Sequence, residues 1–485
     1  MSPGALLILF QKSFMQFAGT LLFFIVIILF DTRGFSSKGL MKIAIILGLS
    51  IGVPLLIAFL NYYFRKFHIE GDKLIFTHGF TFKQTTSIPL ERVHTLRTKR
   101  GVLYQLLNLR GVVFDTLASK EQEVELILNE QDWQQLLQRV RMGEDFAEIK
   151  DESVTLPPPV EDNTVDVSNR DIIKGALCQN HLKGFALLGA ALVWILDKIS
   201  EFRKDTYDRI VDYVDGQAAD VLPSIGACIL LAAIVYVIVM LLWTGSVFLR
   251  YSGMWLRFAD NRLTMESGLL ARYTNRVARD KATVLMIKQN PLEKLAGCQT
   301  ITLRQADNVS GDKNEGNIRI YGTNLGGRLL NWWLGERRGV FDQPLVSARS
   351  GRGLFMRKFI PQPFVAIAVA VIMSYALESW IPAVIVAALY IAVMGLRAAM
   401  AWKHGGIVLN ESYLQIDRGN IACIHEYIKY PDIESVSIRR TPFTSVSGRV
   451  SISISTNAGL STVYALKIDT ARRIRNQILN ARNYL

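Results

Sequence analysis

One unit of about fifty residues occurs three times in the sequence, and each copy directly follows a pair of apolar segments. The three copies align without gaps. Shared positions include a leucine (Leu74, Leu263 and Leu414) and a glycine (Gly79, Gly268 and Gly419). Internal repeats decide the architecture before any local pattern does, and copies spaced this widely are too far apart to be turns of a solenoid. The repeat therefore predicts three separate modules, each placed behind its own pair of helices.

The apolar segments are long enough to cross a lipid bilayer. A hydrocarbon core of about 30 Å needs roughly 20 helical residues, and about 17 are tolerated. The six segments cover residues 13–30, 42–61, 183–199, 223–247, 360–378 and 381–400. The third is short and would need Lys183 and Lys198 to reach toward the headgroups. The alternative, that these are buried core helices, does not explain why paired apolar runs precede every repeat. The first is interpreted as a retained span, since no signal-peptide cleavage site precedes Asp31.

Charged residues around the spans predict their orientation, because Lys and Arg concentrate in cytoplasmic loops. Basic residues follow each even-numbered span, namely Arg65, Arg250 and Lys403. The loop between the third and fourth spans is acidic instead (Glu201, Asp205, Asp208, Asp212, Asp215 and Asp220). Only the first external loop, residues 31–42, is basic and dissents. The balance places both termini and all three modules in the cytoplasm.

Within each copy the apolar pattern changes to the period of two that is typical of β-strands. Copy one alternates around a turn at Gly71, and copy three ends in the alternating run 450–455. The aligned glycine predicts a turn that needs a positive φ. A last strand then leads into an amphipathic helix capped by Asn129 in copy one and by Asp469 in copy three. Each module is thus predicted to be several antiparallel strands closed by one helix.

The module resembles the bacterial pleckstrin-homology-like (PH-like) domain of membrane-bound YdbS/YdbT-type proteins. The resemblance rests on the turn-leucine strand, the aligned glycine, Ile88–Val93 (IPLERV) and Asn290–Gly297 (NPLEKLAG), which returns in part at Thr441–Gly448. It covers nearly the whole chain and implies the long, three-module member of that family, in the bacterial plasma (inner) membrane. The implied module is a seven-stranded bent sheet capped by a helix. Copy two departs from the pattern at Ala278-Arg279, and its Trp332-Trp333 aligns poorly.

The predicted fold is an α+β membrane protein with six transmembrane helices in three hairpins, each followed by a PH-like β-sandwich or barrel capped by a C-terminal helix. The hairpins occupy residues 1–64, 176–249 and 360–402, and the modules occupy residues 65–145, 250–336 and 403–485. Two linkers, 146–175 and 337–359, separate them. The first is acidic and Pro-rich, with disorder expected over Asp151–Asp171. The second is basic, and either solvated or laid on an anionic leaflet.

The sequence offers no catalytic motif. It lacks the HExxH and Walker A patterns, and its six histidines have no metal-ligand spacing. The four cysteines (Cys178, Cys228, Cys298 and Cys423) are scattered and are expected to be free thiols. The resembling family has no recognised catalytic residues either. We therefore expect no enzyme activity, no metal and no cofactor, and no nucleic acid among the partners.

One basic position is shared by all three copies. It holds Lys99-Arg100 in copy one, Lys288 in copy two and Arg439-Arg440 in copy three. If this segment faces the bilayer, these side chains would contact phosphate headgroups as charge-assisted donors; a solvated turn is the simpler explanation. The favoured function is a non-enzymatic membrane protein whose modules bind lipid or scaffold a partner, such as a shorter single-module PH-like membrane protein, in envelope maintenance or stress tolerance. The alternative is a transporter or efflux component built on the six-helix bundle, although the span interiors are almost free of charge.

Overall fold

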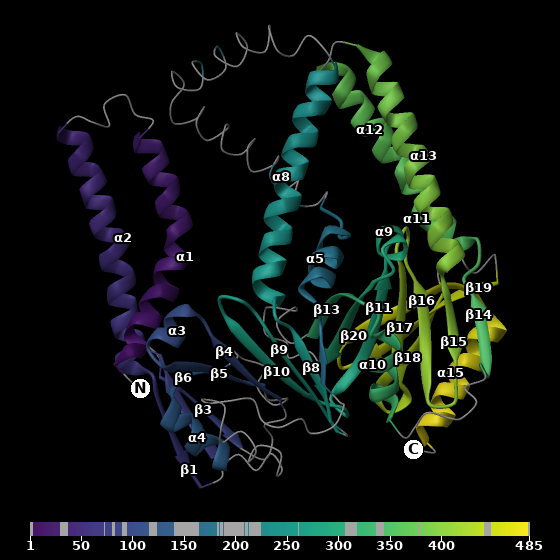
Figure 1. Ribbon diagram of the computed structural model, residues 1–485. Coiled ribbons are helices and arrows are strands. Elements are labelled where there is room, and N and C mark those ends of the chain that lie inside the picture. The colour runs from purple at the N-terminus through teal and green to yellow at the C-terminus, as the bar shows by residue number, and fades with distance from the viewer. Residues whose placement is uncertain are drawn as a thin grey trace.

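The computed structural model places three β modules along one side of the molecule, with long helices rising from that side (Figure 1). The structure describes residues 3–29, 37–71, 73–79, 83–89, 95–115, 124–139, 164–181, 225–259, 261–305, 318–335, 344–376, 379–440 and 448–483, with the single positions 184, 188, 208 and 212. Module 1 contains β1–β6 and α4, module 2 contains β7–β13 and α10, and module 3 contains β14–β20 and α15.

Two long helices precede module 1. They are α1 (Gly4–Leu29) and α2 (Ser37–Phe64). The module consists of β1 (Lys66–Glu70), β2 (Lys73–His78), β3 (Gln84–Pro89), β4 (Thr95–Arg100), α3 (Val102–Leu106), β5 (Leu109–Asp115), β6 (Val124–Asn129) and α4 (Glu130–Arg139). Asn129 caps α4 as predicted, because its Oδ1 accepts a hydrogen bond from the Asp132 backbone N–H at 2.6 Å.

Module 2 begins before its long helix, α8 (Ile225–Tyr251), and continues after it. Its elements are β7 (Thr164–Asp166), α5 (Asn169–Leu177), β8 (Trp255–Phe258), β9 (Arg262–Ser267), β10 (Arg272–Ala278), β11 (Ala282–Gln289), α9 (Pro291–Leu295), β12 (Gln299–Gln305), β13 (Ile318–Thr323) and α10 (Gly326–Leu334). The short strand β7 pairs with the outer edge of β8, with Val165 opposite Leu256.

Module 3 repeats this plan around the helices α11 (Gly353–Phe359), α12 (Pro361–Ala376) and α13 (Trp380–His404). Its strands are β14 (Val346–Arg349), β15 (Gly406–Leu409), β16 (Tyr413–Arg418), β17 (Cys423–Lys429), β18 (Ile433–Arg439), β19 (Arg449–Thr456) and β20 (Gly459–Lys467), with a 3-10 turn at Tyr430–Asp432 and the final helix α15 (Ile468–Asn483). Strand β14 precedes the helices and pairs with β15.

The strands of the two linkers correct one expectation. Disorder was expected over Asp151–Asp171, but Thr164–Asp166 forms β7 and α5 begins at Asn169. Helix α5 packs backbone to backbone on β13: a Cβ added to Gly175 would lie 2.3 Å from the backbone N of Gly322. The basic linker likewise contains β14 and α11 rather than solvated chain alone. Strands of three or four residues carry too few apolar positions to be recognised by their pattern.

The repeat register is confirmed by the buried side chains. Leu74, Leu263 and Leu414 are each 0 % exposed, so a slip of one residue, which would exchange the two faces of each strand, is excluded. The aligned glycines also have positive φ values of 105° at Gly79, 117° at Gly268 and 138° at Gly419. At Gly268 an added Cβ would lie 1.9 Å from the carbonyl oxygen of Ala271, so the turn requires glycine.

The sheets do not stay within their modules, and this differs from the expectation of separate units. The strand orders are β1-β2-β3, β6-β5-β4-β10-β9-β8-β7, β13-β12-β11-β17-β16-β15-β14 and β18-β19-β20. The second half of each module thus pairs with the first half of the next module. We call the β4–β10 pairing seam 1 and the β11–β17 pairing seam 2; both are antiparallel. The module core lies between the two half-sheets and the closing helix.

Within the described residues, three helices are long and apolar enough to cross a membrane. They are Ala232–Tyr251, Gly353–Tyr375 and Trp380–His404, and Gly48–Phe64 is a shorter apolar helix. Most of the predicted span 183–199 lies outside the described residues. These helices suggest membrane association. Six spans remain an expectation.

Candidate functional site

Four basic residues lie at the end of seam 1, and two of them approach the ring of Tyr273. Lys99 and Arg100 end β4, where they lie opposite Tyr273 and Arg272 of β10. The Lys99 Nζ and the Arg250 Cζ each lie 5.8 Å from the centroid of the Tyr273 ring. The four cations of this cluster therefore come from three elements, since Arg250 lies in the last turn of α8. We call Lys99, Arg100, Arg250 and Arg272 the seam 1 cations.

The seam 1 cations are largely open to solvent. Lys99, Arg250 and Arg272 are exposed, and Arg100 is half-buried. The guanidinium of Arg272 lies 3.8 Å from a carboxylate oxygen of Glu266, and its side chain is still 70 % exposed. At the surface such an ion pair stabilises by at most about 1 kcal/mol, so it leaves Arg272 able to bind another anion. The cluster thus presents an excess of positive charge.

Exposed apolar side chains border the seam 1 cations. Leu106 of α3 is 79 % exposed, and Leu269 and Leu270 of the β9–β10 turn are also exposed. The Gln105 side chain donates a hydrogen bond to the Leu270 carbonyl oxygen at 3.4 Å, which joins α3 to this turn. The Leu269 backbone N–H donates to the Leu249 carbonyl oxygen of α8 at 2.9 Å. The apolar border therefore lies directly at the end of an apolar helix.

The equivalent cation of copy two, Lys288, makes a hydrogen bond within module 2. Lys288 is half-buried, and its Nζ donates to the Gln179 side-chain oxygen at 3.4 Å. Gln179 also donates to Glu293 Oε1 at 2.9 Å, and Glu293 is 0 % exposed. Buried polar groups of this kind need partners. Lys288 therefore belongs to an internal network that holds the residues after α5 against α9.

The cations of copy three lie on the outer strand of the last sheet. Arg439 and Arg440 are exposed at the end of β18. Arg439 pairs in register with Ser451 of β19, and neighbouring strand β20 packs against α11, where the Arg357 Cζ lies 3.8 Å from the Tyr464 ring centroid. This end of β18 thus faces the helical side, as the end of β4 does. The three aligned cations do not come together in one site.

Two members of the cluster cannot be found by comparing the repeats. Arg272 sits in the β10 strand, and its position in copy one is Lys83 and in copy three Cys423, so no shared charge marks it. Arg250 is a basic residue at the end of an apolar segment, and from the sequence it indicates only the orientation of that segment in the membrane. Only the pairing of β4 with a strand of the next module places Arg272 opposite Arg100 and brings Tyr273, which Arg250 approaches, opposite Lys99. A search for basic residues at span ends would have found Arg250.

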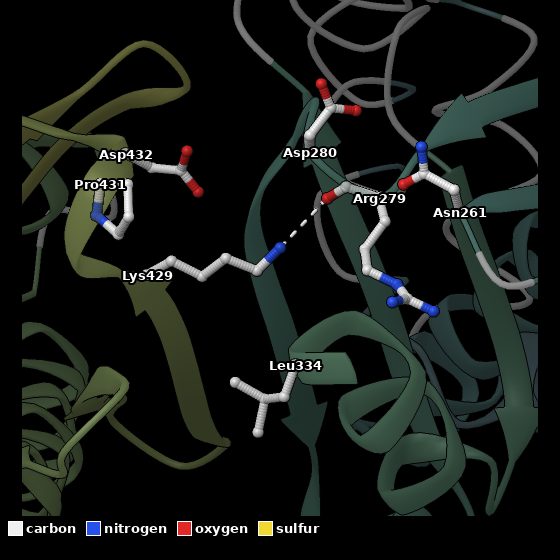
Figure 2. Close-up of a pocket in the computed structure, with 7 residues that line it drawn as sticks. All are labelled: Asn261, Arg279, Asp280, Leu334, Lys429, Pro431 and Asp432. Carbon is white, nitrogen blue, oxygen red and sulfur yellow. Dashed lines mark hydrogen bonds between the residues drawn. The ribbon is translucent and has the colours of Figure 1, made fainter. Parts of the chain in front are cut away.

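A cavity lies between modules 2 and 3 at seam 2 (Figure 2). Its volume is about 340 Å³, and it is lined by Asn261, Arg279, Asp280, Leu334, Lys429, Pro431 and Asp432. The Lys429 Nζ donates a hydrogen bond to the Arg279 carbonyl oxygen at 3.1 Å across it, as Figure 2 shows. Two cations and two carboxylates balance one another here, so the lining selects no single charge of ligand. Across the described residues, no three His, Cys, Asp or Glu side chains gather as a metal would need.

The architecture defines a class: repeated half-open β modules, each closed by a helix and attached to apolar helices. Comparison with family models agrees with this. The bacterial PH domain model matches residues 20–142, 217–337 and 364–482. Because these matches cover most of the chain, the protein belongs to the bacterial PH domain family, with three copies of the domain. No curated protein matches the chain.

Proposed function

We propose that this protein is a non-enzymatic multi-pass protein of the bacterial plasma membrane that binds acidic phospholipid headgroups through the seam 1 cations. The observation that supports it is the presence of four basic residues at the end of seam 1, beside the last turn of α8 and bordered by exposed leucines. In this proposal the three PH-like modules and both termini lie in the cytoplasm. The basic residues that follow the even-numbered spans support that orientation.

The chemistry of the cluster suits the headgroup zone of a bilayer. A Lys or Arg near an anionic leaflet contributes about 1 kcal/mol of binding free energy. Arg272 and Arg250 present planar guanidinium groups, which match a phosphate through paired hydrogen bonds. The leucines on either side suit the boundary between headgroups and acyl chains, where apolar side chains of interfacial helices are buried. The seam 1 cations and the neighbouring leucines would thus contact the same leaflet together.

Such contacts would hold module 1 and module 2 against the leaflet from which their helices emerge. Because module 3 shares a sheet with module 2, it would be held at the same level. The protein would then form a row of PH-like domains fixed along the membrane. We propose that this row serves as a scaffold in envelope maintenance or stress tolerance.

The test uses the full-length protein in nanodiscs and a fluorescent phosphatidylglycerol. The triple variant Lys99→Ala, Arg100→Ala and Arg272→Ala removes three of the seam 1 cations. We expect its affinity for phosphatidylglycerol at low salt to fall about tenfold or more, since each charge contributes about 1 kcal/mol. The deficit should shrink as salt rises, because screening weakens the charges that remain in the parent protein.

The matched control removes the same number of exposed basic residues far from seam 1. Lys467, Arg472 and Arg473 lie at the end of β20 and on α15 of module 3, and all three are exposed. Their triple alanine variant should bind phosphatidylglycerol as the parent does. Equal losses in the two variants would show a general charge effect and would contradict a site. Unchanged binding in the seam 1 variant would leave these cations as a solvated surface.

A further inference from the structure

The two seams of the chain use one and the same register. Thr86, Asn275 and Glu426 occupy one position of the repeat, and Arg97, Met286 and Ser437 occupy another. In seam 1 Asn275 lies opposite Arg97, and in seam 2 Glu426 lies opposite Met286. Two sets of unrelated side chains thus form the same pairing. The register is set by the backbone shape of the module.

Seams 1 and 2 use only some of the equivalent strand edges, and one such edge remains at each end of the row of modules. Strand β3 of module 1 is the equivalent of β10 and β17, and it stands at the edge of its sheet among the described strands. Strand β18 of module 3 is the equivalent of β4 and β11, and it also stands at a sheet edge. Within the described residues, β3 pairs only with β2, and β18 pairs only with β19. The row therefore begins and ends with complementary halves of a seam.

Strand β18 has the same register irregularity as β11, the strand that forms seam 2. In β11, the register toward β12 shifts between Ala282 and Val284. In β18, the register toward β19 shifts between Ile433 and Ser435, which are the same positions of the repeat. An irregularity of this kind bends and twists a strand in a fixed way. The edge that β11 offers to β17 is thus reproduced in β18.

Both outer edges carry the small polar side chains that permit a further strand to approach. Thr85 and Ser87 of β3 are exposed, as are Ser435 and Ser437 of β18. The two strands also match in length, with six residues in β3 and seven in β18. Proteins commonly block an open edge with a lysine or a proline in mid-strand. Neither strand has one there, since Pro89 is the last residue of β3.

We propose that β18 of one copy pairs antiparallel with β3 of a second copy of this chain, in the register of seams 1 and 2. Thr85 would then lie opposite Ile438, Thr86 opposite Ser437, and Ser87 opposite Val436. Figure 1 shows modules 1 and 3 at opposite ends of the row, so one chain does not close on itself. A second copy supplies both missing edges and, being held by its own helices, presents them at the same height. A head-to-tail contact of this kind repeats into a ring or an open row.

The proposal is tested by cysteine cross-linking in native membranes. Two differently tagged full-length chains are co-expressed, one with Thr86→Cys and the other with Ser437→Cys. Directly opposite residues of antiparallel strands have Cα atoms about 4.5–5.5 Å apart, which is within the range for a disulfide. We expect copper-phenanthroline oxidation to produce a disulfide-linked dimer that carries both tags. Each variant expressed with the unmodified chain controls for the native cysteines.

Two further variants make a negative result meaningful. Ser435→Cys replaces Ser437→Cys on the same strand, two residues out of register, and should cross-link to Thr86→Cys at least about fivefold less, because diagonal partners are about 7–8 Å apart. Within one chain, Arg97→Cys with Asn275→Cys reproduces the same repeat position in seam 1 and should form an intramolecular disulfide. If that internal pair forms but the two-tag dimer does not, the pairing between copies is wrong. A dimer equally strong at residue 435, or one in which Ser437→Cys joins only a different protein, would also overturn it.

Discussion

Seam 1 and seam 2 share a backbone register but not a chemistry. Seam 2 is built into the cores of both modules: Tyr413 of module 3 belongs to the core of module 2, and Val284 of module 2 belongs to the core of module 3. Lys429 crosses the same boundary, with its Nζ 4.6 Å from the Trp333 ring centroid. Seam 1 pairs Arg272 with Arg100 and Thr274 with Thr98 instead. Backbone pairing joins all three modules, but only seam 2 is also a hydrophobic interface among the described residues.

Because of this difference, we expect core mutations in modules 2 and 3 to affect both modules, and core mutations in module 1 to affect module 1 alone. Modules 2 and 3 share apolar contacts, so a cavity in one removes support from the other. Module 1 has its own core, which extends into its helices: Ile8 of α1 and Ala58 of α2 pack with Leu109 of β5. Backbone pairs and cation–ring contacts connect it to module 2. The same strand pairing thus forms one junction with a shared apolar core, seam 2, and one junction with mainly polar contacts, seam 1.

The largest expected effect comes from Trp333, which lies beside seam 2. Its ring is 0 % exposed, and its Nε1 donates to the Ala282 carbonyl oxygen at 2.6 Å. Trp333→Ala should destabilise module 2 by about 3–5 kcal/mol and should lower the protection of β17 in module 3. Hydrogen exchange on the full-length protein in detergent measures both. Trp380→Ala is the control, because Trp380 is 69 % exposed on α13. Protection lost only in module 2 would mean that seam 2 does not couple the two cores.

The next largest effect compares the same repeat position in two modules. Leu74→Ala and Leu414→Ala each remove a fully buried side chain and should cost about 2–5 kcal/mol. Leu414 belongs to the core that contains Val284, so its loss should raise exchange in both modules 2 and 3. Leu74→Ala should raise exchange in module 1 alone. If Leu74→Ala also exposed β10, seam 1 would be a stronger joint than its side chains indicate.

A smaller effect is expected at the polar joint itself. Tyr273→Ala removes the ring that Lys99 and Arg250 approach, and each such contact contributes about 0.5–1 kcal/mol at exposed sites. Exchange should increase in β4 and β10 and stay unchanged in β11 and β17. Tyr273→Phe is the matched control, since it keeps the ring and should behave as the parent. An equal effect of both variants would assign the contribution to the hydroxyl.

The smallest expected effect is a loss of module 3 stability at low pH, caused by one pair of side chains on β16 and β17. Burial raises the pKa of Asp417, but hydrogen bonds from His425 and Gln415 outweigh it and hold that pKa below its usual value. The His425 Nδ1 lies 2.7 Å from Asp417 Oδ1. A carboxyl whose pKa is lower in the folded state stabilises above its unfolded pKa of about 3.9 and loses that contribution as pH falls further. Thermal unfolding of module 3 should therefore become easier below about pH 4.

Asp417→Asn tests this and extends the comparison to seam 1. The variant should be less stable than the parent at pH 7 and should show a flatter dependence on acid. The equivalent pair beside seam 1 is Glu266 with Thr274, which offers no histidine. Glu266→Gln should therefore leave the acid dependence of module 2 largely as it is. A parent protein whose module 3 unfolds at the same temperature from pH 7 to pH 3 would contradict a stabilising Asp417 carboxylate.

Much of the fold follows from the repeat, and the reason is physical. The aligned leucines and glycines report burial and positive φ, which are local demands on single residues. The seams could not be predicted, because an edge strand carries no mark of its partner in its hydrophobic pattern. The aligned cations show the same limit. Lys288 looks like Lys99 in the sequence, but Gln179, from a segment assigned to the second helical hairpin, accepts its hydrogen bond. The cluster around Tyr273 depends on two modules at once.

The split modules also impose an order on biosynthesis. Gln105 and Leu270 meet across seam 1 although 165 positions separate them in the chain, and α8 is made between them. At about 5–20 residues per second, the ribosome needs about 8–33 s to supply that partner. During this interval the edge of β4 lacks its partner strand while α8 is made. Seam 1 therefore closes only after α8 has been synthesised, and a chain arrested before that point would expose the open edge of β4.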